Sequence, residues 1–238
     1  MNKNDFILEL KNIDITLSEE NLNNLDIYKE LLKEYNKKFN LTTIIKDTDI
    51  YLKHFYDSLC LLSLNEVRKA KSILDIGTGA GFPGLVIAIV LKDINVVLVE
   101  SNGKKCNFLK EVVSRLNLNN VTIYNMRAEE YVKNSRELFD VVTSRAVADL
   151  TILCELSIPA VSINGYFLPM KAHVDEELNY SMNKIKALGA SLEDVVKYRL
   201  PYEMSERCII KIKKIKKTDN IYPRDYSKII KDLKKVQK

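Results

Sequence analysis

A cluster of glycines gives the clearest chemical signal in the sequence. Residues 74–84 read LDIGTGAGFPG and contain Gly77, Gly79, Gly81 and Gly84, four of the seven glycines of the chain. Glycine permits positive φ and lets a ligand approach the backbone closely. The stretch fits both the Asp-x-Gly-x-Gly-x-Gly loop of methyl-donor sites and the Gly-x-Gly-x-x-Gly loop of dinucleotide sites. On its own, the loop leaves both ligands open.

Acidic residues at the ends of neighbouring expected strands favour the methyl donor. Asp75 lies two residues before Gly77, where an acid of methyltransferases faces the positive end of the donor. Glu100 ends the second expected strand, and its carboxylate could accept hydrogen bonds from ribose hydroxyls, as acids also do in dinucleotide folds. Ala128 and Glu129 follow the third expected strand, where a short side chain and an acid could frame an adenine. Three acids in such places predict a site for a nucleoside-type donor.

The dehydrogenase interpretation also needs residues that handle a hydride. The sequence contains one Tyr-x-x-x-Lys pair, Tyr180 and Lys184. Because the pair lies on a charged expected helix after the fifth expected strand, we interpret it as coincidence.

A metal site or disulfide framework is not indicated by the cysteines and histidines. The four cysteines lie about 50 residues apart and form no Cys-x-x-Cys pair. The two histidines, His54 and His173, are also far apart in the sequence. We therefore expect buried or neutral thiols and no metal.

From residue 72 onward, expected strands alternate with expected helices. The strands are 72–76, 95–100, 121–125, 139–144, 165–171, 193–200 and 206–215. The helices are the segment from Pro83, 103–117, 149–161 and 175–189. This alternation predicts a doubly wound, mostly parallel sheet. The last two strands have no room for a crossover helix, so they should pair antiparallel. A seven-stranded α/β sheet with terminal antiparallel strands resembles the class I S-adenosylmethionine-dependent methyltransferases.

The first part of the chain shows only helical patterns. Apolar residues recur at steps of three and four in 19–40 and again in 49–62. We expect residues 1–66 to form a helical extension packed on the core, 67–216 the methyltransferase domain, and 217–238 a basic tail.

Composition indicates an ordinary globular protein, with 46% hydrophobic and 29% charged residues among 238. No apolar run approaches the roughly 20 residues of a membrane span. The charged start MNKNDFILELKN lacks the apolar core of a signal peptide. We expect a cytoplasmic protein that does not bind membranes, and no pattern requires more than a monomer.

The net charge of +5 is distributed unevenly. Residues 207–238 contain 12 Lys or Arg and 3 Asp or Glu, so the remainder is net acidic. A basic tail on an acidic body favours a polyanionic partner, with nucleic acid first. The alternative is a tail that only improves solubility.

Eight segments, in order along most of the chain, resemble the ribosomal RNA small-subunit methyltransferase G family, also called GidB (glucose-inhibited division protein B). They are YNKKFNLTTI (35–44), KHFYDSL (53–59), LDIGTGAGFPGLVIAI (74–89), VESNGKKCNFL (99–109), RAE (127–129), DVVTSRAVADL (140–150), MKA (170–172) and YPR (222–224). The Asn-Leu-Thr and His-x-x-Asp-Ser pair before the glycine loop is far more specific than the loop itself.

The resemblance implies S-adenosylmethionine as cofactor and methyl transfer to N7 of one guanosine in 16S rRNA, near the decoding centre. Carried over residue by residue, the donor contacts are Gly77, Phe82, Ala128, Glu129 and Arg145. With the loop and the acids argued above, the predicted donor-binding set is Asp75, Gly77, Gly79, Phe82, Glu100, Ala128, Glu129 and Arg145.

Two departures from the family pattern stand out. Glu100 ends the second strand where the family usually has Asp, which keeps the ribose chemistry and lengthens the side chain by one methylene. After YPR the family usually continues with a Gly/Pro-rich basic segment, whereas this chain reads DYSKIIKDLKKVQK. The tail should therefore be more helical here, and how it would meet RNA is open.

The residues expected near the acceptor fit a nucleophile that has no proton to lose. Guanine N7 carries a free lone pair and needs positioning rather than a general base. SRAVAD (144–149) follows the fourth strand where amino methyltransferases carry Asn/Asp-Pro-Pro-aromatic, and no cysteine follows a proline. Arg145 and Lys171 end neighbouring strands, so we predict that Arg145 helps hold the donor and reaches towards RNA phosphate while Lys171 positions the guanine or its backbone.

Two questions stay open from the residues. His54 and Asp57 are one helical turn apart, and they could either hydrogen-bond to the core or face RNA. The chain could also be a methyltransferase of a small molecule or protein, which the basic tail disfavours, or an RNA-binding module without catalysis, which the intact glycine loop disfavours.

Overall fold

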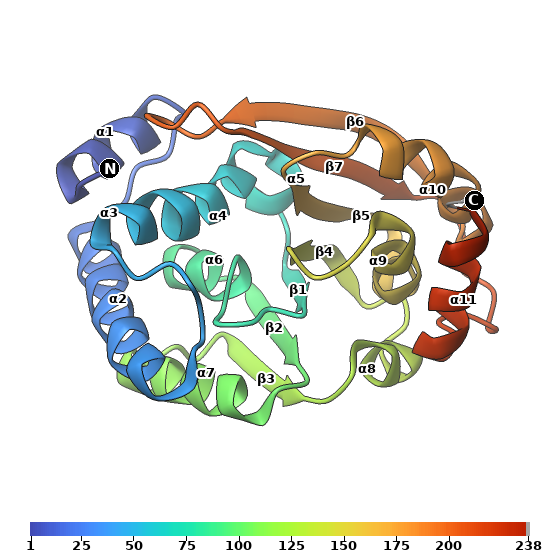
Figure 1. Cartoon of the computed structure of the whole chain (residues 1–238), viewed down its shortest axis with the longest axis horizontal. Helices are drawn as coiled ribbons and strands as arrows, with labels where there is room; N and C mark the ends of the chain where they lie inside the picture. The colour runs from blue at the N-terminus through green and yellow to red at the C-terminus, as the bar shows by residue number, and fades with distance from the viewer. Residues whose placement is uncertain (237–238) are drawn as a thin grey trace.

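Seven strands among residues 1–236 form one sheet through the middle of the molecule (Figure 1). These residues are the part of the chain that the structure, a computed structural model, describes. The strands are β1 (Ser72–Ile76), β2 (Asn95–Glu100), β3 (Val121–Asn125), β4 (Phe139–Arg145), β5 (Val161–Lys171), β6 (Ala190–Arg199) and β7 (Glu206–Lys214). Their order is β3-β2-β1-β4-β5-β7-β6. All neighbours are parallel except β7, which is antiparallel to β5 and to β6. The predicted fold class and the antiparallel pair are confirmed.

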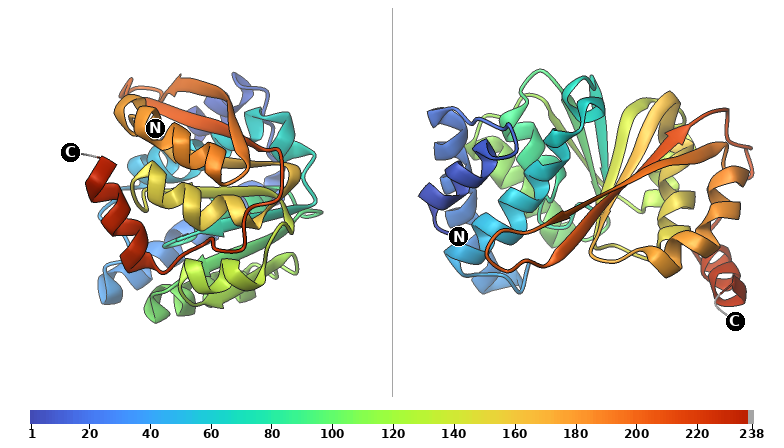
Figure 2. Two further views of the ribbon diagram at one scale, coloured as in Figure 1. Left: turned by 90° about the vertical axis from the view of Figure 1, so that its right-hand side faces the viewer. Right: turned by 90° about the horizontal axis from the view of Figure 1, so that it is seen from above.

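Helices cover both faces of this sheet (Figures 1 and 2). One face carries α1 (Lys3–Lys11), α2 (Glu19–Phe39), α3 (Asp47–Asp49), α4 (Asp57–Leu59), α6 (Gly84–Val90) and α7 (Gly103–Arg115). The other carries α8 (Ala128–Asn134), α9 (Leu150–Ser157), α10 (Asp175–Ala187) and α11 (Tyr226–Val236). Successive side chains of β1 point to opposite faces of the sheet. Ile73 packs in the hydrophobic core on the first face, and Leu74 packs in the core on the second face. This is why the strand carries apolar residues on both of its faces.

The N-terminal helices pack directly onto the glycine loop. Ser18 and Asn21 form a capping box that starts α2, and Asn40 ends the helix in a left-handed conformation. Tyr28 of α2 is fully buried, and its hydroxyl donates a hydrogen bond to the carbonyl of Ala80 in the loop. The helical layer therefore helps to fix the conformation of the predicted donor site.

In place of the single helix expected over 49–62, the chain forms four short helical segments that differ in their hydrogen-bond pattern. After α3, residues Ile50–Tyr56 form a π-helix (η1), α4 follows, and Cys60–Ser63 form a 3₁₀-helix (η2). The short α5 (Asn65–Arg68) then leads into β1. Apolar periodicity predicts a helical segment but cannot distinguish i+5 from i+4 hydrogen bonding. Such π segments occur frequently at functional sites, and this one contains His54.

The end of the described chain returns to the second face of the sheet. After β7 the chain passes through the connection 215–225 and forms α11, so the predicted helical character of the tail is confirmed for 226–236. Residues 237–238 of the predicted tail lie outside the described part. No helix among residues 1–236 is long and apolar enough to span a membrane.

Candidate functional site

The glycine loop joins the end of β1 to α6 and turns through three left-handed residues. Gly77, Gly79 and Gly81 have φ values of 65°, 62° and 102°. A Cβ on Gly77 would lie 2.7 Å from a methyl group of Val147, whereas the nearest atoms to a Cβ on Gly79 are 4.0 Å away. The loop thus passes tightly under the β4–α9 connection at Gly77 and leaves its backbone accessible at Gly79.

Asp75 lies beneath the loop, completely buried. Its Oδ2 accepts hydrogen bonds from Thr78 Oγ1 at 2.6 Å and from the backbone N–H of Gly84 at 2.8 Å. Burial raises the pKa of Asp75 to about 6, against the opposing effect of these two bonds. Oδ1 has no hydrogen-bond partner among the described residues. If Asp75 faces the positive end of the donor, as predicted, the oxygen that does so is Oδ1, because Oδ2 is already hydrogen-bonded within the loop.

Glu100 connects the end of β2 to the same loop. Its Oε2 accepts a hydrogen bond from the N–H of Gly79 at 2.9 Å, and its Oε1 accepts one from Asn102 N at 2.8 Å. Each carboxylate oxygen has a second lone pair. The longer arm of Glu, compared with the Asp usual in the family, thus reaches the glycine loop and can still accept hydrogen bonds from a diol.

A cavity of about 210 Å³ opens beside these residues. It brings together four predicted donor contacts, namely Gly77, Glu100, Ala128 and Glu129. Its remaining lining residues are Ile76, Val99, Ser101, Met126, Arg127, Val147, Leu156 and Tyr226. We call this space the donor cavity. Apolar walls, two carboxylates and a positive-φ glycine backbone fit a nucleoside with free ribose hydroxyls.

Arg145, at the end of β4, faces away from the donor cavity. Its Nη1 donates hydrogen bonds to Asp57 Oδ2 and to the carbonyl of Lys53, both at 2.9 Å. Its Nη2 lies 3.3 Å from His54 Nδ1, and the guanidinium carbon lies 5.3 Å from the ring centre of Phe82. With its side chain 13% exposed, Arg145 is held by the N-terminal layer in this structure. Its predicted contact with the donor stays a prediction.

His54 is a neutral link in the same network. Its ring stacks on Phe82 with centroids 4.1 Å apart and an interplanar angle of 10°. Burial, followed by the nearby charge of Arg145, lowers the pKa of His54 to about 3. A neutral ring can accept from Arg145 at Nδ1 and donate from Nε2 to Thr42 Oγ1, 3.1 Å away. Both His54 and Asp57 therefore hydrogen-bond within the protein, which is one of the two roles expected for them.

Tyr198 completes this network, although no sequence pattern identifies it. Its hydroxyl donates to Asp57 Oδ1 at 2.7 Å across 141 residues of sequence. Thr42 could have been found, since it lies in the Asn-Leu-Thr motif. The network thus joins residues from that motif, the His-x-x-Asp-Ser motif, the glycine loop and the end of β4.

A second, larger cavity of about 580 Å³ lies on the other side of the β4–α9 connection. It is lined by Ile44, Lys53, His54, Asp57, Arg145, Ala146, Met170, Lys171, Ala172, His173, Glu177 and Arg207. We call it the acceptor cavity. Lys171 Nζ donates to Glu177 Oε2 at 2.5 Å and to the carbonyl of Ala148 at 3.0 Å, which ties the end of β5 to this connection. The structure therefore places both Arg145 and Lys171 at this cavity.

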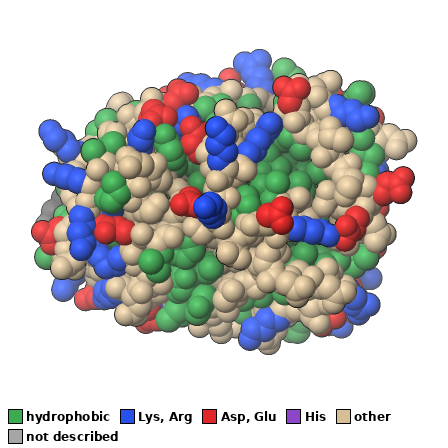
Figure 3. Space-filling view, turned by 180° about the vertical axis from the view of Figure 1, so that it is seen from behind, with side chains coloured by type: hydrophobic (Ala, Val, Ile, Leu, Met, Phe, Trp, Pro, Cys, Tyr) green, Lys and Arg blue, Asp and Glu red, His purple; other side chains and the backbone are tan. Residues whose placement is uncertain are grey.

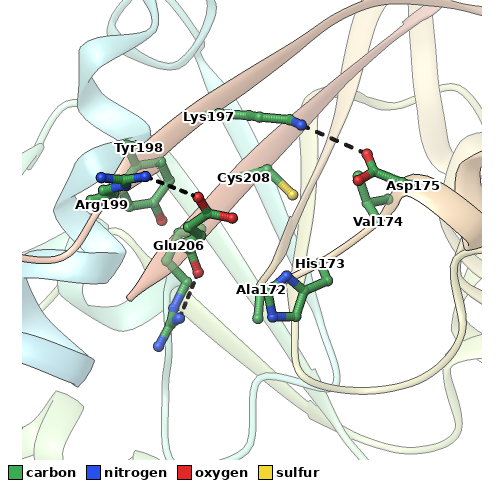
Figure 4. Close-up of a pocket in the computed structure, with 10 residues that line it drawn as sticks. Ala172, His173, Val174, Asp175, Lys197, Tyr198, Arg199, Glu206 and Cys208 are labelled. Carbon is green, nitrogen blue, oxygen red and sulfur yellow. Dashed lines mark hydrogen bonds and ion pairs between the residues drawn. The ribbon is translucent and has the colours of Figure 1, made fainter. Parts of the chain in front are cut away.

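A third cavity continues the acceptor cavity along β6 and β7 (Figure 4). The two share Ala172, His173 and Arg207. Figure 4 shows Lys197 facing Asp175, at 3.7 Å, and Arg199 facing Glu206, at 3.2 Å. Counted together, the two linings contain six Lys or Arg and four Asp or Glu. The groove so formed has a modest excess of positive charge.

Part of the basic segment 207–238 is used inside the protein. Lys214 is 1% exposed, and its Nζ donates to the carbonyl of Ile158 at 2.9 Å. Burial lowers the pKa of Lys214 to about 8. Arg224 pairs with the buried Glu155 at 2.7 Å. In the described part of this segment, the exposed lysines are Lys216, Lys217, Lys228, Lys231 and Lys234.

Other charged side chains and the cysteines lie outside the donor and acceptor cavities or form ion pairs within the described residues. On the face opposite to that of Figure 1, Lys and Arg are interspersed with Asp and Glu around apolar patches (Figure 3). The four cysteines are free and buried, as predicted. Lys184 of the Tyr-x-x-x-Lys pair binds Glu155 at 3.0 Å. No group of three or more His, Cys, Asp or Glu within residues 1–236 is placed to hold a metal.

Solved structures resemble this fold at low identity. A SAM-dependent methyltransferase from Aquifex aeolicus is 16% identical, with a TM-score of 0.54 over 74% of this chain and 97% of that one. A variant of the 16S rRNA (adenine(1408)-N(1))-methyltransferase of Catenulisporales acidiphilia is 12% identical, with a TM-score of 0.53 over 67% and 90%. These likenesses support the class I methyltransferase fold alone.

Sequence comparisons are more specific. The family model described as GidB, rRNA small subunit methyltransferase G, matches residues 21–207. Proteins named ribosomal RNA small subunit methyltransferase G are similar to the chain over nearly their whole length. The one from Lachnoclostridium phytofermentans is 42% identical over 95% of both chains. The one from Bacillus subtilis is 41% identical over 94% of this chain and 95% of that one. The chain therefore belongs to the rRNA small subunit methyltransferase G (GidB) family.

Proposed function

We propose that this enzyme transfers a methyl group from S-adenosylmethionine to N7 of one guanosine in 16S rRNA, near the decoding centre, in the cytoplasm. The observation that carries the proposal is the meeting of two cavities across the β4–α9 connection. Val147 lines the donor cavity, whereas Arg145 and Ala146 line the acceptor cavity. A methyl group can pass in line between two ligands only if their sites adjoin in this way.

On the donor side, this chain's residues would bind and orient the cofactor. Glu100 and Glu129 supply carboxylates for hydroxyl and amino groups, and the Gly77 and Gly79 backbone permits close approach. The buried Asp75 holds the loop through Thr78 and Gly84. Bound there, the cofactor supplies a methyl group on a positively charged sulfur.

On the acceptor side, the groups that line the cavity suit a substrate with a ready lone pair. Asp57 accepts from Arg145, Glu177 accepts from Lys171, and His54 is neutral and bonded at both nitrogens. These groups are engaged in holding the site rather than in taking a proton. Guanine N7 forms its new N–C bond with its own lone pair, and no proton has to leave.

Lys171 and Arg145 divide the positioning work in this proposal. The Lys171 ammonium has three N–H donors, of which Glu177 and Ala148 take two, so a third could reach guanine O6. Arg145 holds the β4–α9 connection against the N-terminal layer and contributes positive charge beside the acceptor. The excess of cations along the groove suits an RNA backbone.

The direct test measures donor binding first and methyl transfer second. Calorimetry with S-adenosylhomocysteine should show binding to the isolated protein. Tritiated S-adenosylmethionine should then label 30S particles or 16S rRNA prepared from cells that lack this methylation, and should not label the same RNA from methylated cells. Binding without transfer to either RNA would favour a non-catalytic module, and transfer to small molecules or protein alone would favour another substrate.

A further inference from the structure

Tyr226, the first residue of the C-terminal helix, lines the donor cavity. Tyr226 is half-buried there beside the exposed Arg127, whose guanidinium carbon lies 4.9 Å from the centre of the Tyr226 ring. Arg127 also pairs with Glu129 at 3.3 Å, so a chain of contacts runs from the tail to a predicted donor contact. The tail thus reaches the cofactor side of the enzyme, whereas its charge alone suggested a role with RNA.

A small separate core holds α11 against α9, beside which it lies in Figures 1 and 2. Ile229 and Leu233 of α11 are 1% and 9% exposed and cluster with Ile152 and Leu156 of α9. Leu156 belongs both to this cluster and to the wall of the donor cavity. The packing of α11 is therefore linked to the shape of the cavity through a shared side chain.

A charged contact fixes the start of the same helix. Arg224 donates from Nε and from its backbone N–H to Glu155 Oε1 at 2.8 and 3.0 Å, and from Nη2 to Oε2 at 2.7 Å. The side chain of Glu155 is completely buried, and Arg224 also pairs with Asp232 at 2.6 Å. Because such a bidentate pair has a fixed geometry, it sets where Tyr226 emerges two residues later.

We propose that α11 forms one wall of the donor site, with Tyr226 and Arg127 contacting the adenosine part of the cofactor. This inference rests on the proposed function, since it assigns the cofactor to the donor cavity. Aromatic side chains bind bases by stacking, and Tyr226 is the one aromatic ring among the described residues that line this cavity. Cofactor binding and docking of α11 then strengthen each other, as linkage requires.

The test uses cofactor affinity without RNA or catalysis. S-adenosylhomocysteine is titrated calorimetrically into the full-length wild-type protein and into Tyr226→Leu, Tyr226→Phe and Ser227→Ala. Tyr226→Leu should weaken binding at least about fivefold, because it removes the ring and keeps an apolar side chain. Tyr226→Phe should bind within about twofold of wild type, since it keeps the ring. Ser227→Ala, one residue away and exposed, is the matched control and should bind as wild type does.

Wild-type affinity in Tyr226→Leu would overturn the inference, while failure of the wild-type protein to bind would overturn the proposed function instead. Amide hydrogen exchange gives a second readout that needs no variant. S-adenosylhomocysteine should slow exchange in 226–236 as well as in the glycine loop. Protection of the glycine loop alone would show that α11 is no part of the donor site. Weaker RNA binding by Tyr226→Leu at unchanged cofactor affinity would assign the helix to RNA and would equally overturn the inference.

Discussion

Asp57 Oδ2 lies 2.9 Å from Arg145 Nη1, although 88 residues separate the two in the sequence. The Asp57 side chain is 6% exposed and that of Arg145 is 13% exposed, so the pair is shielded from water. It joins the N-terminal layer to the end of β4, where the donor and acceptor cavities meet. The N-terminal helices are thereby a structural part of the candidate site.

Asp57→Ala should lower the free energy of unfolding by about 3 kcal/mol, because it leaves the Arg145 charge buried and unpaired. Urea unfolding followed by circular dichroism measures this difference. The control is Glu206→Ala, which breaks the exposed ion pair with Arg199 and should cost less than about 1 kcal/mol. Equal effects of the two substitutions would contradict the special role of the Arg145–Asp57 pair.

Arg145→Lys should keep the positive charge and lose the forked contacts to Asp57, Lys53 and His54. The rate of methyl transfer should fall by about 100-fold or more, because the β4–α9 connection would no longer be held in place between the two cavities. Affinity for S-adenosylhomocysteine should change by less than about threefold if Arg145 acts by positioning. A large loss of affinity would instead support its predicted direct contact with the donor.

Stability should fall in mildly acidic solution because of His54. The pKa of His54 in the folded protein, about 3, lies below the ordinary histidine pKa of 6.5, so the unfolded chain binds a proton that the folded protein does not bind. The contribution of His54 to the free energy of unfolding is fully present above pH 6.5 and is lost as the pH falls below that value. Between pH 7.5 and 5.5 the free energy of unfolding of the wild type should fall by about 1 kcal/mol more than that of His54→Gln. The variant is needed because burial raises the pKa of Asp75 to about 6, which acts in the opposite direction. Identical pH profiles would show that His54 protonates freely in the folded protein.

Gly77→Ala should weaken S-adenosylhomocysteine binding by at least about tenfold. The new Cβ would meet Val147 at 2.7 Å in a backbone with φ of 65°, which costs about 1–2 kcal/mol for a left-handed L-residue. Gly103→Ala is the control, because a Cβ there would find its nearest neighbour at 3.4 Å. Calorimetry compares the two variants. Normal binding by Gly77→Ala would mean that this part of the loop does not form the donor site.

Lys171→Met should lower the rate of methyl transfer by about tenfold or more and leave cofactor affinity within about twofold of wild type. The reason is that Lys171 lines the acceptor cavity and does not line the donor cavity. Lys110→Met removes the same charge from an exposed position on α7 and should leave both quantities unchanged. If the two variants transferred methyl groups equally well, Lys171 would have no part in positioning the guanine.

The fold could be predicted closely from the sequence because short apolar strands such as β1 and β2 alternate with helices. The predicted strands 95–100 and 121–125 match β2 and β3 at both ends. Local pattern also located the glycine loop and the acids around it. The first strand residues of β5 were missed, since Val161 pairs with β4 before an irregularity in register that no periodicity reveals.

The contacts of the site could be predicted only in part. The Arg145–Asp57 pair and the Tyr198 hydroxyl depend on packing between distant segments. The π-helix around His54 depends on hydrogen bonds that apolar spacing does not encode. Net charge of the tail predicted an RNA partner, but a count of lysines cannot show that Lys214 and Arg224 are used internally. For the same reason Tyr226 gave no signal before the position of α11 was known.

Whether this enzyme methylates N7 of guanine in small-subunit rRNA is decided by identifying the atom that carries the new methyl group. Unmodified 30S particles are incubated with the enzyme and S-adenosylmethionine, and the RNA is then treated with borohydride and aniline, which cleave the strand at N7-methylguanosine. We expect one enzyme-dependent cleavage site in 16S rRNA and N7-methylguanosine as the new nucleoside by mass spectrometry. Methyl transfer to rRNA with no such cleavage, or with the methyl group on another base atom, would contradict the proposed N7 methylation.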